Sequence, residues 1–367
     1  MSGWSFHNPV RVRFGEGALD DIAEVLAGRS YVLLTHPDAP MARWRSHIVE
    51  RAGPPLLTLD DIEPNPSLAM LRRLCAQIGQ ETPQVIVALG GGSVIDSAKF
   101  LAAGHGRYEP VVQYLEGAGD TLPRALPIIA VPTTAGTGSD LTKWATVWDP
   151  ERERKLSLNR DDLYPETVLI DPLVMATLPW PTTLASGLDA LSHALESLWN
   201  VNANPVTRDF AIQAARDLMA GLPRLQRDLG DGEARVLMAL GAARAGLAFS
   251  NTQTALAHNI SYPITLRRQT PHGLACSFCL PEVLAAAIGA DPACDAALTA
   301  IFGDLAGAPA SLRRRLDDLG VAANPEALGI GADEWRDILD QAFAGPRGRN
   351  FIGSRARFPS MPIVAGA

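Results

Sequence analysis

The stretch VIVALGGGSVIDSAKF, residues 85–100, runs from an apolar segment through three glycines into a segment with helical spacing. The apolar run predicts a buried parallel strand that is followed by a helix. A helix that begins directly after a glycine turn presents free backbone N–H groups and the positive end of its dipole, which together bind phosphate. The glycines match neither the G-x-G-x-x-G nor the Walker pattern, so a tight turn without a ligand is the alternative.

The same alternation of strands and helices extends over the first half of the chain. Segments that predict buried parallel strands lie at 31–35, 85–90, 127–134 and 167–171, and RVRFGEG near the start predicts an extra edge strand. Helical segments at 17–29 and 67–80 alternate with these strands. This order predicts an α/β domain with a doubly wound parallel sheet.

The second half of the chain has a different residue composition. Long Ala- and Leu-rich stretches at 205–229, 233–250 and 281–305 predict helices, and Pro179 and Pro181 mark the change. We therefore expect a dinucleotide-binding α/β domain over 1–178 and an α-helical metal and substrate domain over 179–367.

A second polar loop follows another predicted strand. IIAVPTTAGTGSDLT, residues 128–142, places Thr133, Thr134 and Thr137 among glycines at the end of that strand. Hydroxyl groups and glycines at the carboxyl end of a parallel strand suit a polar ligand. Two such loops in one sheet favour a long ligand with a pyrophosphate, and a dinucleotide fits.

Four residues of the second half form a candidate metal-binding set. In TLASGLDALSHALESLWN, residues 183–200, Asp189 and His193 are four apart and share one helix face. His258 and His272 add two imidazoles, and one carboxylate with three imidazoles suits Fe²⁺ or Zn²⁺. The alternative is that these histidines are unrelated core or surface residues.

Charge and composition narrow the class of protein. The net charge of −8 argues against a nucleic-acid binder, and no apolar run is long enough to span a bilayer. The N-terminus lacks the features of a signal peptide, so we expect a cytoplasmic protein. Cys276 and Cys279 form one C-x-x-C without a second pair, which favours small buried residues over a zinc knuckle.

The chain resembles the iron-containing (group III) alcohol dehydrogenase family over nearly its full length. Four motifs carry the resemblance: GGGSVIDSAK, PTTAGTGSDLT, GLDALSHALES, and the pair formed by His258 and PHG at 271–273. The resemblance implies a dehydroquinate synthase-like architecture and a metal-dependent, NAD(P)H-linked reduction of a small aldehyde to a primary alcohol. Fe²⁺ is the first expected metal and Zn²⁺ the second.

The resemblance also implies roles for single residues. The metal ligands would be Asp189, His193, His258 and His272. The cofactor-binding residues would be Gly91, Gly92, Ser93, Asp96, Thr133, Thr134, Thr137 and Lys155.

Two positions depart from the family pattern. Many relatives carry a second histidine four residues after the third ligand, where this chain has Tyr262. We therefore name Tyr262 and His258 as the catalytic candidates, with Tyr262 or a ribose hydroxyl passing the proton. Relatives that prefer NAD often carry an aspartate where His36 stands, and since His36 does not repel a 2′-phosphate, NADH and NADPH both stay open.

Cationic side chains near these motifs point to an anionic substrate, with surface solvation as the alternative. The cationic candidates are Lys143, Arg267, Arg347 and Arg349, with Arg268 beside them, and the neutral Trp144 is a further candidate next to Lys143. SDLTKWATVWD, residues 139–149, resembles the phosphonoacetaldehyde reductase branch of the family, which implies phosphonate metabolism and 2-hydroxyethylphosphonate as product.

Other readings stay open at this point. The closest are a sulfoacetaldehyde reductase and a general aliphatic alcohol dehydrogenase. A non-catalytic or non-redox nucleotide- and metal-binding protein on the same scaffold is the alternative from another class. We also expect a homodimer that pairs through the edge strand.

Overall fold

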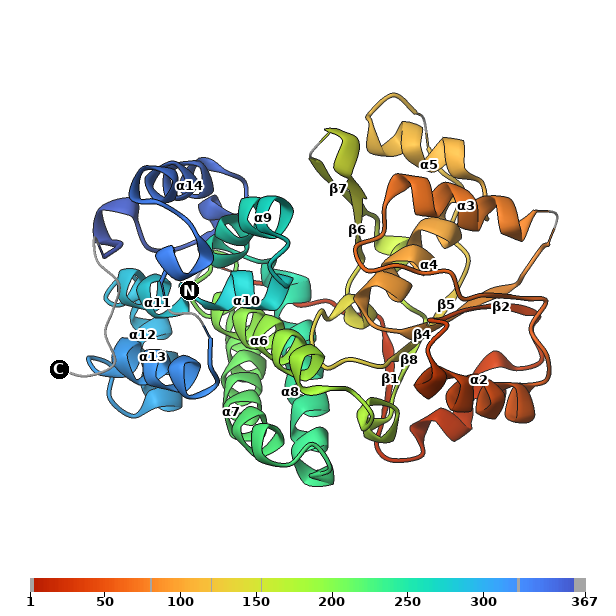
Figure 1. Ribbon diagram of the computed structural model, residues 1–367, viewed down its shortest axis with the longest axis horizontal. Coiled ribbons are helices and arrows are strands. Elements are labelled where there is room, and N and C mark those ends of the chain that lie inside the picture. Colours follow the sequence, from red (N-terminus) through yellow and green to blue (C-terminus); the bar gives the residue numbers. More distant parts are fainter. Residues whose placement is uncertain (1–2, 80, 120, 153, 322–323, 360–367) are drawn as a thin grey trace. The chain divides into compact units, whose positions relative to one another are not determined.

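The computed structural model describes residues 3–79, 81–119, 121–152, 154–321 and 324–359. These residues form two compact units (Figure 1). One unit is Asn8–Leu178, and the other joins the described residues of Pro179–Ala367 to those of Met1–His7. The division falls between Leu178 and Pro179, and residues 3–7 group with the helical unit.

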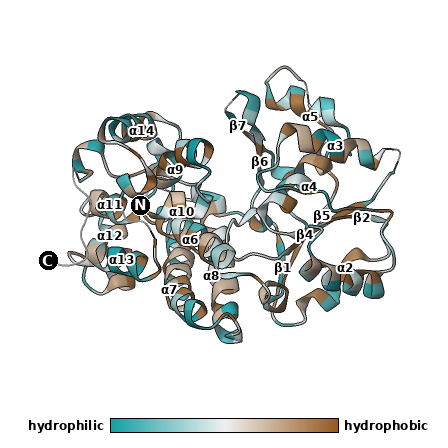
Figure 2. Ribbon diagram, in the orientation of Figure 1, coloured by the Kyte–Doolittle hydropathy of each residue, from teal (hydrophilic) through white to brown (hydrophobic). Residues whose placement is uncertain are grey.

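The first unit contains a six-stranded parallel sheet in the order β1-β8-β5-β4-β2-β3. Its strands are β1 (Arg11–Phe14), β2 (Tyr31–Leu34), β3 (Leu57–Leu59), β4 (Val85–Gly90), β5 (Ile128–Pro132) and β8 (Thr167–Ile170). The four predicted buried strands and the predicted edge strand are confirmed, whereas β3 is too short to show a periodic pattern. The central strands are apolar along their whole length (Figure 2), because helices cover both faces of the sheet.

Helices lie on both faces of this sheet, so the predicted doubly wound arrangement is confirmed. Alternate strand residues, such as Leu33, Val87 and Val131, pack with α1 (Ile22–Leu26) and α2 (Ala39–Ala52) into one core. The opposite face carries α3 (Leu68–Ile78), α4 (Gly92–Gly104) and α5 (Tyr108–Leu115) (Figure 1).

A two-stranded antiparallel sheet follows the second polar loop, and the sequence pattern did not predict it. It consists of β6 (Trp144–Asp149) and β7 (Arg154–Asn159), with Trp148 opposite Lys155. Its outer residues are polar and partly exposed, so the hairpin lacks the continuous apolar run of the central strands.

The second unit is helical, as predicted. Its helices are α6 (Trp180–Glu196), α7 (Pro205–Arg227), α8 (Gly232–Thr252), α9 (Leu256–Arg268), α10 (His272–Ser277), α11 (Leu280–Ala287), α12 (Pro292–Phe302), α13 (Ala308–Asp318) and α14 (Ala332–Ala344). The stretch 281–305, predicted as one helix, breaks because Gly289 takes a positive φ of 76° and Pro292 starts a new helix. No helix among the described residues combines the length and the apolar character needed to cross a bilayer.

Short 3₁₀ turns complete the two units. They are Ala18–Asp21, Ser139–Leu141, Pro150–Arg152, Asp161–Leu163, Pro172–Met175, Glu326–Leu328, Gly348–Asn350 and Arg355–Arg357.

Candidate metal centre and cofactor loops

Asp189 and His193 lie one turn apart on the buried part of α6. Pro181 in the first turn suits a helix start, and the following Ala- and Leu-rich residues favour helix and bury this face. His193 Nε2 lies 3.8 Å from Asp189 Oδ1, and both side chains are almost completely buried. The His193 ring stacks on Phe249 of α8 with 4.0 Å between centroids, which fixes its orientation.

Helices α9 and α10 bring the other two predicted ligands to the same carboxylate. His258 Nε2 lies 3.5 Å from Asp189 Oδ1, and His272 Nε2 lies 4.0 Å from it. Gly273 makes this approach possible, because a Cβ atom there would lie 1.8 Å from the backbone oxygen of Ala185 on α6. The structure thus brings all four predicted ligand residues around one carboxylate oxygen.

Three polar atoms at this centre lack hydrogen-bond partners. Within the described chain, Asp189 Oδ1, His193 Nδ1 and His258 Nε2 are buried and unpaired. Unpaired buried polar atoms cost about 1–3 kcal/mol each, so a divalent cation held by Asp189 and His258 would remove much of that cost. The nitrogen and oxygen donors also match the preference of first-row divalent ions. The residues present therefore fit a divalent metal.

Burial and neighbouring charges set the protonation of the centre. Burial raises the pKa of Asp189, but the nearby imidazoles of His193, His258 and His272 reverse this and leave its pKa below the ordinary value. Burial lowers the pKa of His193 to about 4, against the opposing charge of Asp189. An ionised carboxylate and a neutral imidazole are the forms that bind a metal.

Glu196, at the end of α6, was not predicted and holds His258 in place. Its buried Oε2 lies 2.6 Å from His258 Nδ1 and accepts from the backbone N–H of Ala255 at 2.8 Å. Its Oε1 accepts from the N–H groups of Ala257 at 2.5 Å and His258 at 3.2 Å. The carboxylate thereby orients the ring so that Nε2 faces Asp189, as outer partners of metal-ligating histidines do.

Cys276 is a second residue that the sequence analysis did not assign to the centre. It is buried, as expected, but its Sγ lies 3.6 Å from His272 Nε2. Burial raises the pKa of this thiol, and the charges of His258 and His272 outweigh burial and bring its pKa to about 7. The four-residue spacing between His272 and Cys276 was the signal in the sequence that could have identified it.

Tyr262, the predicted proton-transfer residue, lies beside the last predicted ligand. It is one turn after His258 on α9, and its ring is parallel to the His272 ring with 6.3 Å between centroids. The position next to the centre is compatible with the predicted role, which stays a prediction.

The glycine loop and the threonine loop of the first unit pack directly against each other. A Cβ atom on Gly91 would lie 3.1 Å from Thr134 Oγ1, and one on Gly92 would lie 2.7 Å from Thr137 Cγ2. None of the three glycines has a positive φ, so none of them uses the left-handed region that glycine allows. Glycine is required at Gly91 and Gly92 because a side chain there would collide with the threonine loop.

Asp96 and Lys99 of α4 tie the two loops together. Asp96 accepts from Ser139 Oγ at 2.5 Å and from the N–H of Thr146 at 2.8 Å. Lys99 is fully buried, and its Nζ donates to the backbone oxygens of Ser139 and Trp144, both at 2.6 Å. In this structure Asp96, predicted to line the pyrophosphate, has its carboxylate engaged with the second loop.

The other predicted cofactor residues lie in the same unit. Thr133 is buried and its N–H donates to Gly90 O, while Ser93 Oγ accepts from the N–H of Asn65. Lys155 projects over the ring of Trp148 across the hairpin. His36 Nδ1 lies 3.1 Å from Ile62 O, beyond the end of β2. No contact in the structure tests their roles toward a nucleotide.

The predicted anion-binding residues divide between the two units and are mostly engaged elsewhere. Lys143 pairs with Asp161 at 2.5 Å, and the backbone oxygen of Trp144 is bound by Lys99. Arg347 donates to Gln253 Oε1 and Arg349 to the backbone of Ala344.

Two arginines between the last two predicted ligands differ in their surroundings. Arg268 pairs with Glu334 at 2.6 Å, whereas Arg267 is exposed and makes no ion pair with any described residue. Arg267 is therefore the candidate cation least committed within its own unit.

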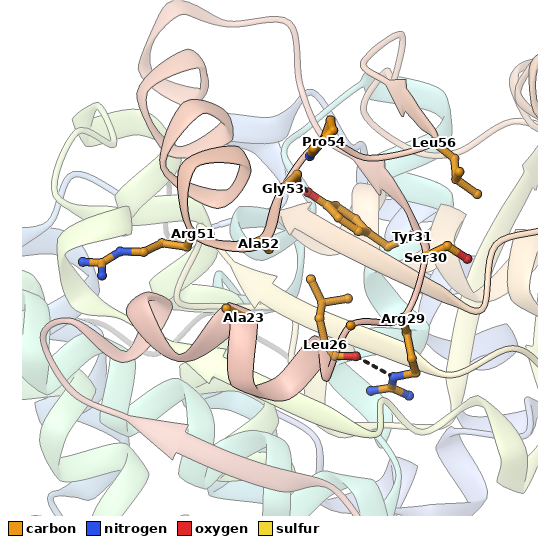
Figure 3. Close-up of a pocket in the computed structure, with 11 residues that line it drawn as sticks. Ala23, Leu26, Arg29, Ser30, Tyr31, Arg51, Ala52, Gly53, Pro54 and Leu56 are labelled. Carbon is orange, nitrogen blue, oxygen red and sulfur yellow. Dashed lines mark hydrogen bonds between the residues drawn. The ribbon is translucent and has the colours of Figure 1, made fainter.

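A separate pocket of about 400 Å³ lies beside the start of β2, away from the ends of the strands where the loops lie (Figure 3). Arg29 and Arg51 lie on opposite sides of it (Figure 3). Arg29 pairs with Glu166, and Arg51 with Asp20. Because carboxylates already compensate both guanidinium groups, this pocket is not a strong anion site.

Comparison with known proteins places the chain in a family. Residues 9–172 match the iron-containing alcohol dehydrogenase domain, and residues 183–346 match the C-terminal domain of that family. The 1,3-propanediol dehydrogenase of Klebsiella pneumoniae is 30% identical over 364 residues, which cover 92% of this chain and 93% of that protein. The chain belongs to the iron-containing alcohol dehydrogenase family.

Two other similar proteins are named as reductases of phosphonoacetaldehyde and of sulfoacetaldehyde. The phosphonoacetaldehyde reductase of Streptomyces viridochromogenes is 34% identical over 251 residues, covering 66% of this chain and 62% of that protein. The sulfoacetaldehyde reductase of Bifidobacterium kashiwanohense, solved in complex with NAD⁺, superposes with a TM-score of 0.89 at 25% identity over 96% and 95% of the two chains. This iron-containing alcohol dehydrogenase is thus an oxidoreductase with the family fold.

Proposed function

We propose that this enzyme uses NADH or NADPH to reduce a small anionic aldehyde to a primary alcohol, with phosphonoacetaldehyde as the first candidate and 2-hydroxyethylphosphonate as its product. The observation that carries the proposal is the set of buried, unpaired donor atoms around Asp189. A non-catalytic metal-binding protein would hold the same atoms ready for an ion, and the match to a family of oxidoreductases favours the catalytic role.

Asp189, His193, His258 and His272 would hold a divalent ion, Fe²⁺ or Zn²⁺. A bound ion would supply Lewis-acid polarisation of the substrate carbonyl, and a reduced nicotinamide would supply the hydride. Glu196 keeps Nδ1 of His258 protonated and its Nε2 free to bind. Tyr262 then delivers a proton to the product oxygen from its place beside His272.

The glycine and threonine loops would hold the cofactor. The backbone N–H groups at the start of α4 would donate hydrogen bonds to the pyrophosphate, and Gly91 and Gly92 let the glycine and threonine loops pack closely against each other. Position 36 carries a histidine and no acidic side chain, so no carboxylate at this position would repel the 2′-phosphate of NADPH.

Two kinds of support favour an anionic substrate. Two of the matched relatives are named for aldehydes that carry a phosphonate or a sulfonate. Arg267, in the segment between His258 and His272, is a cation without a carboxylate partner in the described chain. Phosphonoacetaldehyde ranks before sulfoacetaldehyde because of the 139–149 segment, and a plain aliphatic aldehyde ranks third.

The test compares substrates on the metal-loaded enzyme. NADH and NADPH oxidation would be followed with phosphonoacetaldehyde, sulfoacetaldehyde and propanal. We expect kcat/KM for phosphonoacetaldehyde to exceed that for propanal by about a hundredfold, roughly 2.7 kcal/mol of transition-state discrimination. Equal values for propanal and the two anions would reject the anionic substrate and leave a general alcohol dehydrogenase.

We also propose that the enzyme is a homodimer that pairs through β1. This strand forms an edge of the sheet, and Val12 and Phe14 on it are exposed apolar residues. Light scattering of the purified protein tests the proposal, since a monomer at micromolar concentration would contradict it.

A further inference from the structure

The short helix α10 carries a cysteine on the same face as a predicted metal ligand. Cys276 follows His272 by four residues, so both side chains project toward the same point. Its Sγ lies 3.6 Å from His272 Nε2 and 3.8 Å from Nδ1. The thiol is buried and forms no disulfide.

Four ligand atoms form a compact group at this point. One atom each from Asp189, His258, His272 and Cys276 lie within 4.8 Å of one another. Ligands at 2.0–2.3 Å in a tetrahedral arrangement stand about 3.3–3.6 Å apart. The distances of 3.5 Å between His258 Nε2 and Asp189 Oδ1 and of 3.6 Å between Cys276 Sγ and His272 Nε2 match this spacing, whereas the 4.0 Å between His272 Nε2 and Asp189 Oδ1 is longer and would shorten around a bound ion.

A second observation is independent of the cysteine. Asp189 Oδ1 and His258 Nε2 are buried in this group and have no hydrogen-bond partner among the described residues. Both side chains are more than nine-tenths buried. Two unpaired atoms directed into the same space as a thiol indicate that a cation is the missing partner.

We propose that Cys276 binds the metal through its thiolate, beside Asp189, His258 and His272. The inference rests on the metal centre of the proposed function and gives it a sulfur ligand in the place of His193, which is not part of the four-atom group. As the metal–sulfur bond forms, the thiol proton passes to solvent. Because thiolate is a soft ligand, the centre favours Zn²⁺ or Co²⁺ over Mn²⁺ more strongly than nitrogen and oxygen donors would.

The test is spectroscopic and does not depend on turnover. The full-length protein would be loaded with Co²⁺ and, separately, with Zn²⁺. We expect a thiolate-to-cobalt charge-transfer band in the near ultraviolet and a sulfur scatterer at about 2.3 Å from zinc in X-ray absorption. The X-ray measurement on the wild-type protein needs no variant, so a folding defect in a mutant cannot obscure the result.

Two variants assign the signal to one sulfur. Cys276→Ser should abolish the band and weaken Zn²⁺ binding at least tenfold more than Mn²⁺ binding. Cys279→Ser is the matched control, because Cys279 is also buried and lies three residues on, but is not part of the four-atom group. Its band should equal that of the wild type.

The outcomes separate the inference from the proposed function. Cobalt binding with a spectrum of only nitrogen and oxygen ligands would overturn the role of Cys276 and leave the proposed function standing. Failure of the wild-type protein to bind Co²⁺, Zn²⁺, Mn²⁺ or Fe²⁺ would overturn both.

Discussion

Replacing Glu196 with glutamine tests how the protein holds its metal centre. The carboxylate accepts three backbone N–H groups and lies 2.6 Å from His258 Nδ1, and it is completely buried. Burial raises the pKa of Glu196, but the charge of His258 and the hydrogen bonds lower it below its ordinary value, so the group is ionised. Glutamine keeps the shape and removes the charge.

The magnitude follows from the two oxygens. Each carboxylate oxygen receives two donors, so the NH₂ group of glutamine meets two N–H groups whichever way it turns. If the NH₂ group faces His258 Nδ1, the ring loses its acceptor, and a hydrogen bond to a charged group contributes about 1.5–3 kcal/mol. Loss of such a partner weakens metal binding about 10- to 100-fold, which is about 1.4–2.8 kcal/mol.

The assay is a competition titration of Zn²⁺ between the protein and a chromophoric chelator. Glu282→Gln serves as the control, because Glu282 is also a buried acid but pairs with Arg313 at 2.6 Å outside the metal-binding group. We expect both variants to lose thermal stability and only Glu196→Gln to lose metal affinity. A folded Glu196→Gln protein that binds Zn²⁺ within twofold of wild type would refute the positioning role of Glu196.

Three further predictions test other parts of the molecule. The His258→Ala variant should lose both bound metal and turnover. Full activity in metal-free His258→Ala protein would contradict the metal mechanism. Gly92→Ala places a Cβ 2.7 Å from Thr137 Cγ2, so it should destabilise the packed loops by about 1–3 kcal/mol and weaken NADH binding measured by fluorescence titration. Gly232→Ala, with nothing within 4 Å of its Cβ, should do neither. Burial lowers the pKa of Lys99 to about 8, against the charges of two nearby aspartates, from 10.5 for the exposed side chain. Between pH 8 and 10.5 the side chain of Lys99 is therefore protonated more often in the unfolded chain than in the folded one. The free energy of unfolding of the wild type relative to that of Lys99→Met, measured in urea titrations, should rise with pH over this window. A difference that stays flat or falls would contradict the prediction.

Much of the fold follows from short-range patterns in the sequence. Apolar β-branched runs predicted the central strands because both faces of the parallel sheet are buried. Elements with weaker patterns escaped prediction: β3 has three residues, and the hairpin of β6 and β7 is polar on its exposed side. The break at Gly289 inside an Ala-rich stretch depends on one positive φ, which composition alone does not show.

Site residues that belong to a sequence motif could be predicted, whereas site residues that are brought in only by a tertiary contact could not. Asp189 and His193 share a helix face at a spacing that can be read directly. Glu196 was not identified, because His258, the residue that it orients, lies 62 positions away. Cys276 has a readable spacing from His272, but without the fold nothing indicates that this face points at Asp189.

Metal dependence of the reduction tests the central claim most directly. The purified enzyme would be stripped with a chelator, assayed with NADH or NADPH and phosphonoacetaldehyde, and then titrated with Fe²⁺ or Zn²⁺. We predict that activity disappears on stripping and returns in proportion to bound metal until one ion per chain is reached. A stripped, folded enzyme that retains its full rate would contradict the account.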